Sequence, residues 1–531
     1  MKTNISLYEG IRIQALKSPN NIALLYKGLN IPYITLLKSI NKVAHALDSL
    51  NIKQDDVITI CLPNFPFSVY LMYAVNQNGN IINFTHPLLT LKQMKEAITE
   101  TKSKYLFCLD TKYAEFLPLV NDGVTVIPCS PVESLPPYIK LLYKFKVRDK
   151  ISLVKKSRYT SKYFLDYSPK SDFVKMSKED QIYLHSGGTT SKSKTIALSS
   201  YALNSLAKTT KYILGTNEVE NKYMYSLLPM FHGFGLCMGI HSCLFNGAAD
   251  NLMPNFNVNE TVKNIKAGKL NFLIGIPPIY EALLAHKDFH GKTLKNLYVA
   301  YIGADFVSKD LLNRFNERMK EAGSSCRIFE GYGLTETVTV IAVNTFKFNK
   351  EGSVGKALPN CEFMIRDIEN TKTLPPLQAG EIYCSGETLM NGYRFSTDNA
   401  FYTDSNNKLW VKTGDMGYLD EEGYLFFKQR IKRIIKVSGI TVFPTEIEQT
   451  VTSLPFVKNA VAKGVSDKKR GSMVKLFVVL SSKEKTELEY KKIITEEIKS
   501  NNGVYAQPKE IVFMDSFPKT AVGKIDQKNL K

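Results

Sequence analysis

Short apolar strands alternate with helical stretches through much of this 531-residue chain, and this alternation restricts the fold more than any other feature. Between residues 1 and about 170, strand-like segments at 56–61 and 104–109 lie among helical ones. A second series of the same kind includes 272–276 and 297–302. Such alternation predicts parallel sheets covered by helices. The length of the chain predicts more than one domain.

Two further regions have different patterns. From about 350 to 428 the helical period disappears, and Gly, Pro and short alternating runs predict antiparallel strands, with a hairpin at 417–426. The last hundred or so residues return to an α/β pattern, with a strand at 473–480 and a helix around 488–498. This tail is long enough to fold as a small domain.

We therefore predict an α/β protein with an N-terminal domain of residues 1–430 and a small α/β C-terminal domain of residues 431–531. The larger domain should contain two helix-covered sheets and a small β-barrel-like part. The N-terminus reads as an amphipathic helix ending before Pro19, without a signal-peptide pattern, and no apolar run predicts a membrane span. The eight cysteines are scattered, which is typical of reduced thiols in a cytoplasmic protein.

The net charge of +19 raises the question of a nucleic-acid partner. The excess is spread along the chain, which argues against that partner. One concentration stands out: residues 140–162 hold nine basic residues against Asp149 alone, interleaved with Leu, Tyr, Phe and Val. The segment is either a solvated basic lobe, the more common meaning of such a run, or a weak peripheral contact with an anionic membrane surface.

Four motifs occur in an order that suits the activation of a carboxylic acid by ATP. The loop HSGGTTSKSKT at 185–195 offers hydroxyls, a lysine and glycines that let the backbone approach phosphate. EGYGLTET places Glu336 between two threonines, which suits a magnesium ion bridging phosphate oxygens. KTGD ends in Asp415, an acceptor suited to ribose hydroxyls, and PKTAVGK ends in Lys524, a cation that can stabilise charge building in the transition state.

A P-loop NTPase is a minor alternative for the first motif. Gly188 to Thr195 matches G-x-x-x-x-G-K-T except at Ser193. A P-loop opens directly into a helix, whereas residues 195–198 read as a strand before a helix capped near Ser199 or Ser200.

Together the motifs resemble those of the adenylate-forming superfamily, which includes acyl-CoA synthetases, carrier-loading adenylation domains and firefly-type luciferases. The resemblance covers nearly the whole chain. It implies ATP, Mg²⁺ and coenzyme A as cofactors, and two half-reactions. In the first, a carboxylate and ATP give an acyl-adenylate and pyrophosphate; in the second, a thiol displaces AMP.

The resemblance also implies nucleotide-binding residues. Tyr332 and Gly333 would line the adenine and acyl pocket, Thr335 would lie near the phosphate, and Glu336 would be the magnesium site. The phosphate loop would consist of Ser186, Gly187, Gly188, Thr189, Thr190 and Lys194.

Five residues complete the implied machinery toward the C-terminus. Asp415 and Arg430 would hold the ribose, and Lys432 would be the hinge between the two domains. Lys524 would be the adenylation lysine. Gly439 lies in a loop similar to the one that meets the pantetheine arm of coenzyme A.

The substrate prediction depends on the segment PMFHGFG. His232 matches the family position that gates the acyl pocket. Amino-acid-activating relatives usually have an aspartate after the Phe that matches Phe231, where it holds the α-ammonium of the substrate, and here that residue is His232. We expect a carboxylate without an α-amino group, such as a fatty acid or another apolar acid. An apolar wall suited to an alkyl chain would be formed by Gly233, Phe234, Gly235, Cys237 and Met238.

Departures from the family loop keep three functions open. The family usually has Gly at Ser191, Pro at Ser193 and Gly at Thr195, and a lost glycine strains the loop if its position needs a positive φ. The first function is an acyl-CoA synthetase that uses free coenzyme A. The second is a stand-alone ligase that loads the phosphopantetheine of an acyl carrier protein, and the third is a binding protein with a decayed site.

Overall fold

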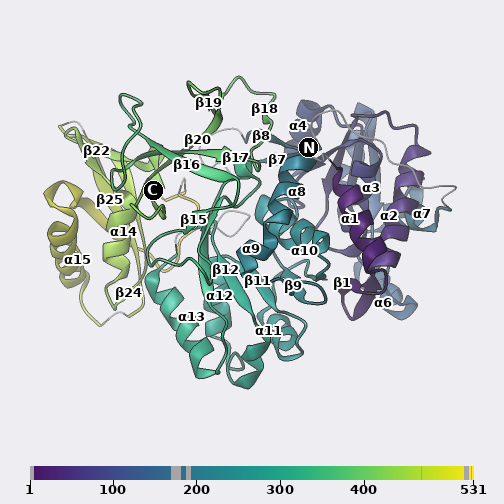
Figure 1. The fold of residues 1–531 in the computed structure, drawn as a ribbon, viewed down its shortest axis with the longest axis horizontal. Helices are drawn as coiled ribbons and strands as arrows, with labels where there is room; N and C mark the ends of the chain where they lie inside the picture. Colours follow the sequence, from purple (N-terminus) through teal and green to yellow (C-terminus); the bar gives the residue numbers. More distant parts are fainter. Residues whose placement is uncertain are drawn as a thin grey trace.

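A computed structural model gives the fold, which consists of helix-covered sheets and a smaller C-terminal unit (Figure 1). The mixed α/β architecture that the sequence predicts is confirmed. None of the described helices is long and apolar enough to cross a lipid bilayer. The structure describes residues 5–168, 181–186, 193–305, 307–467, 469–482, 484–518, 525–527 and 529–530.

The first sheet has nine strands among the described residues, in the order β15-β14-β13-β12-β11-β9-β10-β1-β2. The strands from β13 to β1 are parallel, and antiparallel strands flank them at both edges. The strands predicted at 272–276 and 297–302 are β11 and β12. The bounds are β1 (Ile22–Tyr26), β2 (Leu29–Pro32), β9 (Tyr223–Ser226), β10 (Ala249–Leu252), β11 (Phe272–Gly275), β12 (Val299–Ile302), β13 (Ile328–Tyr332), β14 (Ala342–Val343) and β15 (Lys356–Ala357).

The second sheet has seven strands in the described part of the chain, ordered β18-β8-β7-β4-β3-β5-β6. Strands β7, β4, β3, β5 and β6 are parallel to one another, whereas β8 is antiparallel to both of its neighbours, β7 and β18. The strands predicted at 56–61 and 104–109 are β3 and β5. The bounds are β3 (Val57–Cys61), β4 (Ile81–Phe84), β5 (Tyr105–Leu109), β6 (Thr125–Cys129), β7 (Ile182–His185), β8 (Thr195–Leu198) and β18 (Gly392–Arg394).

An antiparallel sheet lies between these sheets and the C-terminal elements (Figure 1). It occupies the region in which the sequence predicts antiparallel strands, and the predicted hairpin at 417–426 joins β20 to β21. The strands are β16 (Cys361–Arg366), β17 (Gly380–Gly386), β19 (Phe401–Thr403), β20 (Leu409–Leu419) and β21 (Leu425–Arg430).

The C-terminal elements form a sheet of their own, in the order β23-β22-β25-β24 with β26 beside β25. Apolar side chains from this sheet and its two helices form a cluster separate from the main core. The elements are the 3₁₀ turn η7 (Ile431–Arg433), β22 (Ile435–Val437), β23 (Ile440–Val442), α14 (Pro444–Thr452), β24 (Val457–Asp467), β25 (Gly471–Leu480), α15 (Glu487–Asn502) and β26 (Pro508–Phe513).

Helices cover the two large sheets, and α3 is buried along its whole length because α1 and α2 pack over it. All eight cysteines are free, and all but Cys361 are buried, as their scattered positions predict. The remaining helices are α1 (Leu7–Lys17), α2 (Tyr33–Asp48), α3 (Pro66–Gln77), α4 (Leu91–Thr101), α5 (Tyr113–Phe116), α6 (Pro137–Val147), α7 (Ser161–Asp166), α8 (Ser200–Lys208), α9 (Thr210–Leu214), α10 (Ser242–Phe245), α11 (Val258–Lys266), α12 (Pro277–Leu284) and α13 (Lys309–Glu321).

Candidate active site

The carboxylate of Asp415 is buried where the antiparallel sheet meets the nine-stranded sheet. Asp415 lies on β20 directly opposite Arg430 on β21, and the Arg430 Nε is 3.4 Å from Asp415 Oδ1. The hydroxyl of Tyr332, at the end of β13, donates a hydrogen bond of 2.8 Å to Asp415 Oδ2. Burial raises the pKa of Asp415 to about 6, although Arg430 and Tyr332 act to lower it.

The second carboxylate oxygen of Asp415 is an available acceptor. Oδ1 is buried and accepts no hydrogen bond from the described residues, since Arg430 reaches it only at ion-pair distance. An ionised oxygen left in this state costs free energy unless a donor completes it. Ribose hydroxyls are suitable donors, so Asp415 and Arg430 fit the nucleotide role that the sequence predicts for them.

The loop after β13 folds back tightly on itself. A Cβ on Gly333 would lie 1.8 Å from the carbonyl oxygen of Thr339, so only glycine permits this path. Val338 and Thr339 have φ values of 64° and 138°, which are strained for β-branched residues. The 3₁₀ turn η6 (Thr335–Thr337), which carries Glu336, lies between these points. Backbone strain of this kind concentrates at functional sites.

Glu336 connects the strained loop to the second sheet. Its Oε1 accepts a hydrogen bond of 2.9 Å from the hydroxyl of Tyr393 on β18, and its backbone oxygen accepts one of 2.9 Å from the Met390 amide. No cluster of three or more His, Cys, Asp or Glu side chains that could hold a metal occurs within the described ranges. Mg²⁺ usually takes one or two protein carboxylates and completes its shell with water and substrate phosphates. A single carboxylate at Glu336 therefore fits a magnesium ion carried with ATP.

The amine of Lys194 lies beside the same tyrosine. Lys194 Nζ is 2.7 Å from Asp398 Oδ2 and 4.4 Å from the centre of the Tyr393 ring. The hydrogen bond from Lys194 lowers the pKa of Asp398, and the charge of Lys432 adds to the effect. Lys194, which is predicted to belong to the phosphate loop, and Glu336 thus contact the same tyrosine side chain. A phosphate bound there would compete with Asp398 for the charge of Lys194.

Ser186 and Lys194 close the base of the phosphate loop. The Ser186 amide donates a hydrogen bond of 2.9 Å to the backbone oxygen of Lys194, and the Lys194 amide donates one of 2.9 Å to Ser186 Oγ. The Ser193 hydroxyl adds a bond of 2.7 Å to the Ser186 carbonyl. The Ser186 hydroxyl therefore fixes the loop base, and its contact with phosphate stays a prediction. Six loop residues lie outside the described ranges: Gly187, Gly188, Thr189, Thr190, Ser191 and Lys192.

The departures at the end of this loop cause no left-handed strain. Neither Ser193 nor Thr195 has a positive φ, so neither position requires glycine. Thr195 begins β8, and its hydroxyl donates a hydrogen bond of 3.1 Å to Glu100 Oε2. Helix α8 follows only after this strand and is capped by Ser199, whose Oγ accepts from the Ala202 amide. A strand in this place, as predicted, is incompatible with a P-loop.

His232 lies at the entrance to a buried π-helix, Phe234–His241. Its ring centre is 4.7 Å from that of Phe231. A Cβ on Gly233 would lie 3.2 Å from the carbonyl oxygen of Val338, which shows how closely this segment packs on the strained loop. The predicted gate to the acyl pocket is therefore next to the loop that carries Glu336.

The predicted hinge directly follows the residues predicted to hold the ribose. Arg430 ends β21, and Lys432 lies in the η7 turn that leads to the C-terminal sheet. Gly439 forms the exposed turn between β22 and β23, with a φ of 81° after Ser438 at 52°. Lys524 lies outside the described residues.

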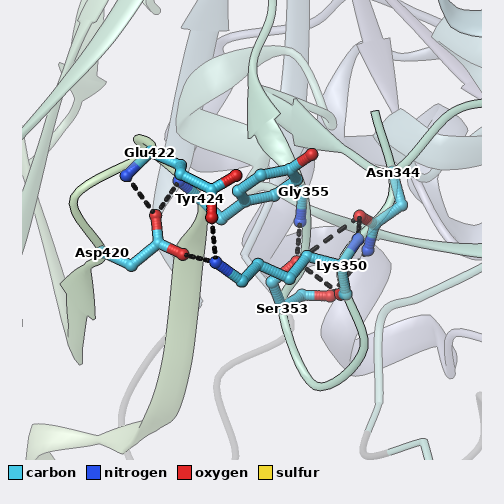
Figure 2. A network of polar contacts seen from close by, with 7 residues as sticks. All are labelled: Asn344, Lys350, Ser353, Gly355, Asp420, Glu422 and Tyr424. Atoms are coloured by element: carbon cyan, nitrogen blue, oxygen red, sulfur yellow. Dashed lines mark hydrogen bonds and ion pairs between the residues drawn. The ribbon is translucent and has the colours of Figure 1, made fainter. Parts of the chain in front are cut away.

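A polar network holds the β20–β21 hairpin in place (Figure 2). Asp420 Oδ1 accepts from the amides of Glu422 and Tyr424, and Asp420 Oδ2 lies 2.6 Å from Lys350 Nζ. The same amine is 2.7 Å from Glu422 Oε1, and the backbone amide of Lys350 donates a hydrogen bond of 3.1 Å to Asn344 Oδ1. Asn344 directly follows β14, which pairs with β13. The network therefore ties the hairpin that carries Asp415 to the pair of strands that includes Tyr332.

Two residues of this site are absent from the sequence-based prediction, Tyr393 and Asp398. Tyr393 is separated from Glu336 by 57 residues and shares no motif with it. A tyrosine after Gly392 at the start of a short strand gives no signal of such a contact. The predicted residues that the structure brings together are Lys194, Tyr332, Gly333, Thr335, Glu336, Asp415 and Arg430.

The fold and this site define an enzyme that activates acids through AMP. The chain belongs to the AMP-binding enzyme family: the family model matches residues 11–394, and the model of the AMP-binding enzyme C-terminal domain matches residues 446–524. It is an acid–thiol ligase, and adenylate-forming ligases of this kind use ATP, Mg²⁺ and coenzyme A. The superfamily predicted from the motifs is confirmed.

Relatives with known names agree on the class. A long-chain-fatty-acid–CoA ligase of Bacillus subtilis is 27% identical over 99% of this chain and 94% of its own length. A probable 4-coumarate–CoA ligase 3 of Dictyostelium discoideum is 29% identical over 93% of this chain and 88% of its own. In structure, ATP-bound MatB from Rhodopseudomonas palustris gives a TM-score of 0.85 at 21% identity, covering 98% of this chain and 97% of MatB. The acids in the names of the two ligases, a long-chain fatty acid and 4-coumarate, differ.

Proposed function

We propose that this ligase activates an apolar carboxylic acid of the fatty-acid class and transfers the acyl group to coenzyme A. The observation that carries the proposal is the chemistry of the segment from His232 to Met238. Within it, Cys237 and Met238 are buried, and no carboxylate is available to hold an α-ammonium group. An apolar wall of this kind favours an alkyl chain over an amino acid.

The packing of this segment supports the same interpretation. A Cβ on Gly235 would lie 2.3 Å from the carbonyl oxygen of Leu228, so the chain turns sharply into the π-helix. The turn sets Gly233, the residue after His232, against Val338, which is two residues from Glu336. An acid entering past His232 would bring its carboxylate toward the phosphate side of the site.

The proposed chemistry has two steps. A carboxylate oxygen attacks the α-phosphorus of ATP, the bond to pyrophosphate breaks, and an acyl-adenylate forms. The thiol then loses its proton to solvent and its sulfur attacks the acyl carbon; the carbon–oxygen bond to AMP breaks, and AMP leaves with that electron pair. The protein's electrostatic contribution is to offset charge on the phosphates and the reacting carboxylate.

Each step has proposed residues. Asp415 and Arg430 hold the ribose, Glu336 holds the magnesium ion, and Lys194 with its loop contacts the phosphates. Lys524 contacts the α-phosphate during adenylation. The second step uses the loop at Gly439, after the C-terminal domain turns about Lys432.

We also propose domains of residues 1–430 and 431–531. This division is supported by two separate apolar clusters, one reaching to Leu425 and the other beginning at Ile435. The backbone between them contains the single 3₁₀ turn η7, short enough to act as a hinge.

Carboxylate-dependent exchange of pyrophosphate into ATP tests the proposed acid class. The purified protein is incubated with acids from acetate to palmitate and with 4-coumarate, and coenzyme A is then added for detection of acyl-CoA by mass spectrometry. We expect exchange with an alkyl acid and a new acyl-CoA.

Exchange with 4-coumarate alone would overturn the fatty-acid assignment. Exchange without acyl-CoA would indicate a carrier protein as acceptor, and no exchange with any acid would indicate a decayed site. The Glu336→Gln variant, which keeps the shape but loses the charge, controls for contaminating ligases.

A further inference from the structure

Helix α6 carries an apolar stripe that faces solvent. The α6 patch consists of Tyr138, Leu141, Leu142 and Phe145, which are 65%, 70%, 66% and 74% exposed. Their i, i+3, i+4, i+7 spacing places all four on one side of the helix. No residue of α6 is buried, so these side chains do not contribute to the core.

The opposite side of α6 fixes the orientation of the patch. Ile139 and Tyr143 pack on the main core, and the Tyr143 hydroxyl donates a hydrogen bond of 2.6 Å to the buried carboxylate of Asp110. Lys140 adds an ion pair of 3.4 Å with Glu133. The helix is therefore anchored through one side, and its apolar stripe points outward as a result of the fold.

Basic side chains flank the patch and follow it in the sequence. On a helical projection Lys144 and Lys146 lie on either flank of the stripe. The exposed cations that follow or flank the stripe, here called the basic rim, are Lys144, Lys146, Arg148, Lys150, Lys155, Lys156 and Arg158. Asp149 is the one acidic residue between positions 137 and 158. Leu153 and Val154, within the same stretch, pack inward and so hold the following cations at the surface.

We propose that the α6 patch and the basic rim dock this enzyme on an anionic lipid bilayer. An interfacial helix of this type buries its apolar side chains at the level of the acyl chains, while lysines and arginines contact anionic headgroups. A second copy of the chain is a poorer occupant, because a symmetric contact would bring two basic rims together. Helix α6 lies at the end of the molecule away from α15, so a bilayer docked on this helix would leave the C-terminal elements clear (Figure 1).

Co-sedimentation of the full-length protein with vesicles tests the proposal. Vesicles of phosphatidylcholine alone are compared with vesicles containing about 30% phosphatidylglycerol, at about 0.1 M and 0.5 M NaCl. We expect binding to the anionic vesicles at low salt, and loss of most of it at high salt. Absence of binding at low salt, or equal binding to both vesicle types, would overturn the proposal.

Paired variants separate the patch from non-specific adhesion. The partition coefficient of Leu142→Ser/Phe145→Ser should fall by about tenfold or more, since two large apolar side chains no longer enter the bilayer. Lys144→Gln/Lys146→Gln should lose several-fold in affinity and part of the salt dependence. Matched double variants on α15 and the turn that directly follows it, Leu488→Ser/Val504→Ser and Lys492→Gln/Lys499→Gln, should bind as the parent protein does.

Two results would count against a bilayer as the occupant. One is a patch variant that binds vesicles as well as its α15 control does. The other is a parent protein that forms dimers in sedimentation velocity, with Leu142→Ser/Phe145→Ser restoring the monomer. Thermal melts confirm that the variants fold, which is expected because every changed side chain is exposed. Vesicle binding is measured without ATP or acid, so its failure is distinguishable from failure of the proposed ligase reaction.

Discussion

The hydroxyl of Tyr332 donates a hydrogen bond of 2.8 Å to Asp415 Oδ2, joining residues 83 positions apart in the sequence. The bond directs one carboxylate oxygen toward β13. The other oxygen faces Arg430 at 3.4 Å without a hydrogen bond. The site therefore contains a buried carboxylate with one oxygen that is available to accept a hydrogen bond from a ligand.

Replacing Asp415 by asparagine should weaken ATP binding. A hydrogen bond to a charged acceptor contributes about 1.5–3 kcal/mol, so the KM for ATP should rise by roughly 10- to 100-fold in Asp415→Asn. The dependence of pyrophosphate exchange on ATP concentration measures this change. Asp404→Asn, on the exposed turn before β20, is the control. An unchanged KM would exclude Asp415 from the ribose site.

The pH profile should report the ionisation of Asp415. Its pKa is raised to about 6 by burial, so kcat/KM for ATP should decline as the pH falls through that value. The Tyr332 hydrogen bond lowers this pKa, and Tyr332→Phe should therefore move the acid limb to higher pH. Rates measured from about pH 5 to pH 8 test the shift, with Tyr418→Phe as the control. An acid limb at the same pH in Tyr332→Phe would contradict the assignment.

Tyr393 should act as a positioning residue for Glu336. Loss of the 2.9 Å hydrogen bond to this carboxylate in Tyr393→Phe should cost about 1.5–3 kcal/mol, so the Mg²⁺ concentration for half-maximal activity should rise roughly 10- to 100-fold. Saturating Mg²⁺ should restore most of the activity. Tyr402→Phe, a tyrosine of β19, provides the control for a Mg²⁺ titration. A lower plateau at every Mg²⁺ concentration with no shift would indicate a structural role instead.

Lys432→Pro should separate the two half-reactions. Proline fixes φ near −65° and so restricts rotation in the proposed hinge. Pyrophosphate exchange should be preserved, while acyl-CoA formation should decline by about tenfold or more. Lys432→Ala removes the charge but leaves the backbone free, and should retain both activities. Equal rates of acyl-CoA formation in the two variants would show that Lys432 is not the hinge.

Asp250 should make the stability of the protein depend on pH. Its side chain is fully buried on β10, its carboxylate oxygens accept no hydrogen bond from the described residues, and burial raises its pKa to about 8. The folded protein keeps this proton up to that pH, whereas the unfolded chain loses it near pH 4. Stability is therefore lost as the pH rises between these values, by roughly 1.4 kcal/mol for each pH unit.

Asp250→Asn removes this titration and should flatten the dependence. Urea unfolding at about pH 5 and pH 8 measures the difference, with the exposed Asp310→Asn of α13 as the control. The variant should gain stability relative to the parent protein at the higher pH. Parallel changes in both proteins would show that Asp250 does not titrate in this range.

Local patterns predicted most of the elements, because they depend on short-range chemistry. Strands β3, β5, β11 and β12, the hairpin between β20 and β21, and the Ser199 cap of α8 all occur where periodicity and turn residues predict them. The absence of positive φ at Ser193 and Thr195 could not be predicted in the same way. Backbone dihedrals at a loop end depend on what the loop closes against, here the carbonyl and hydroxyl of Ser186.

By itself, the sequence determined the α/β class and the order of the motifs, and it predicted which acids and cations carry the chemistry. The tertiary structure alone decided that Tyr393 holds Glu336, that Tyr332 holds Asp415, and that the apolar residues of α6 face outward. Hydrophobic periodicity specifies that a helix has an apolar side, but not which side packs on the core. Contacts between distant residues depend on how whole sheets meet, and no local signal encodes that geometry.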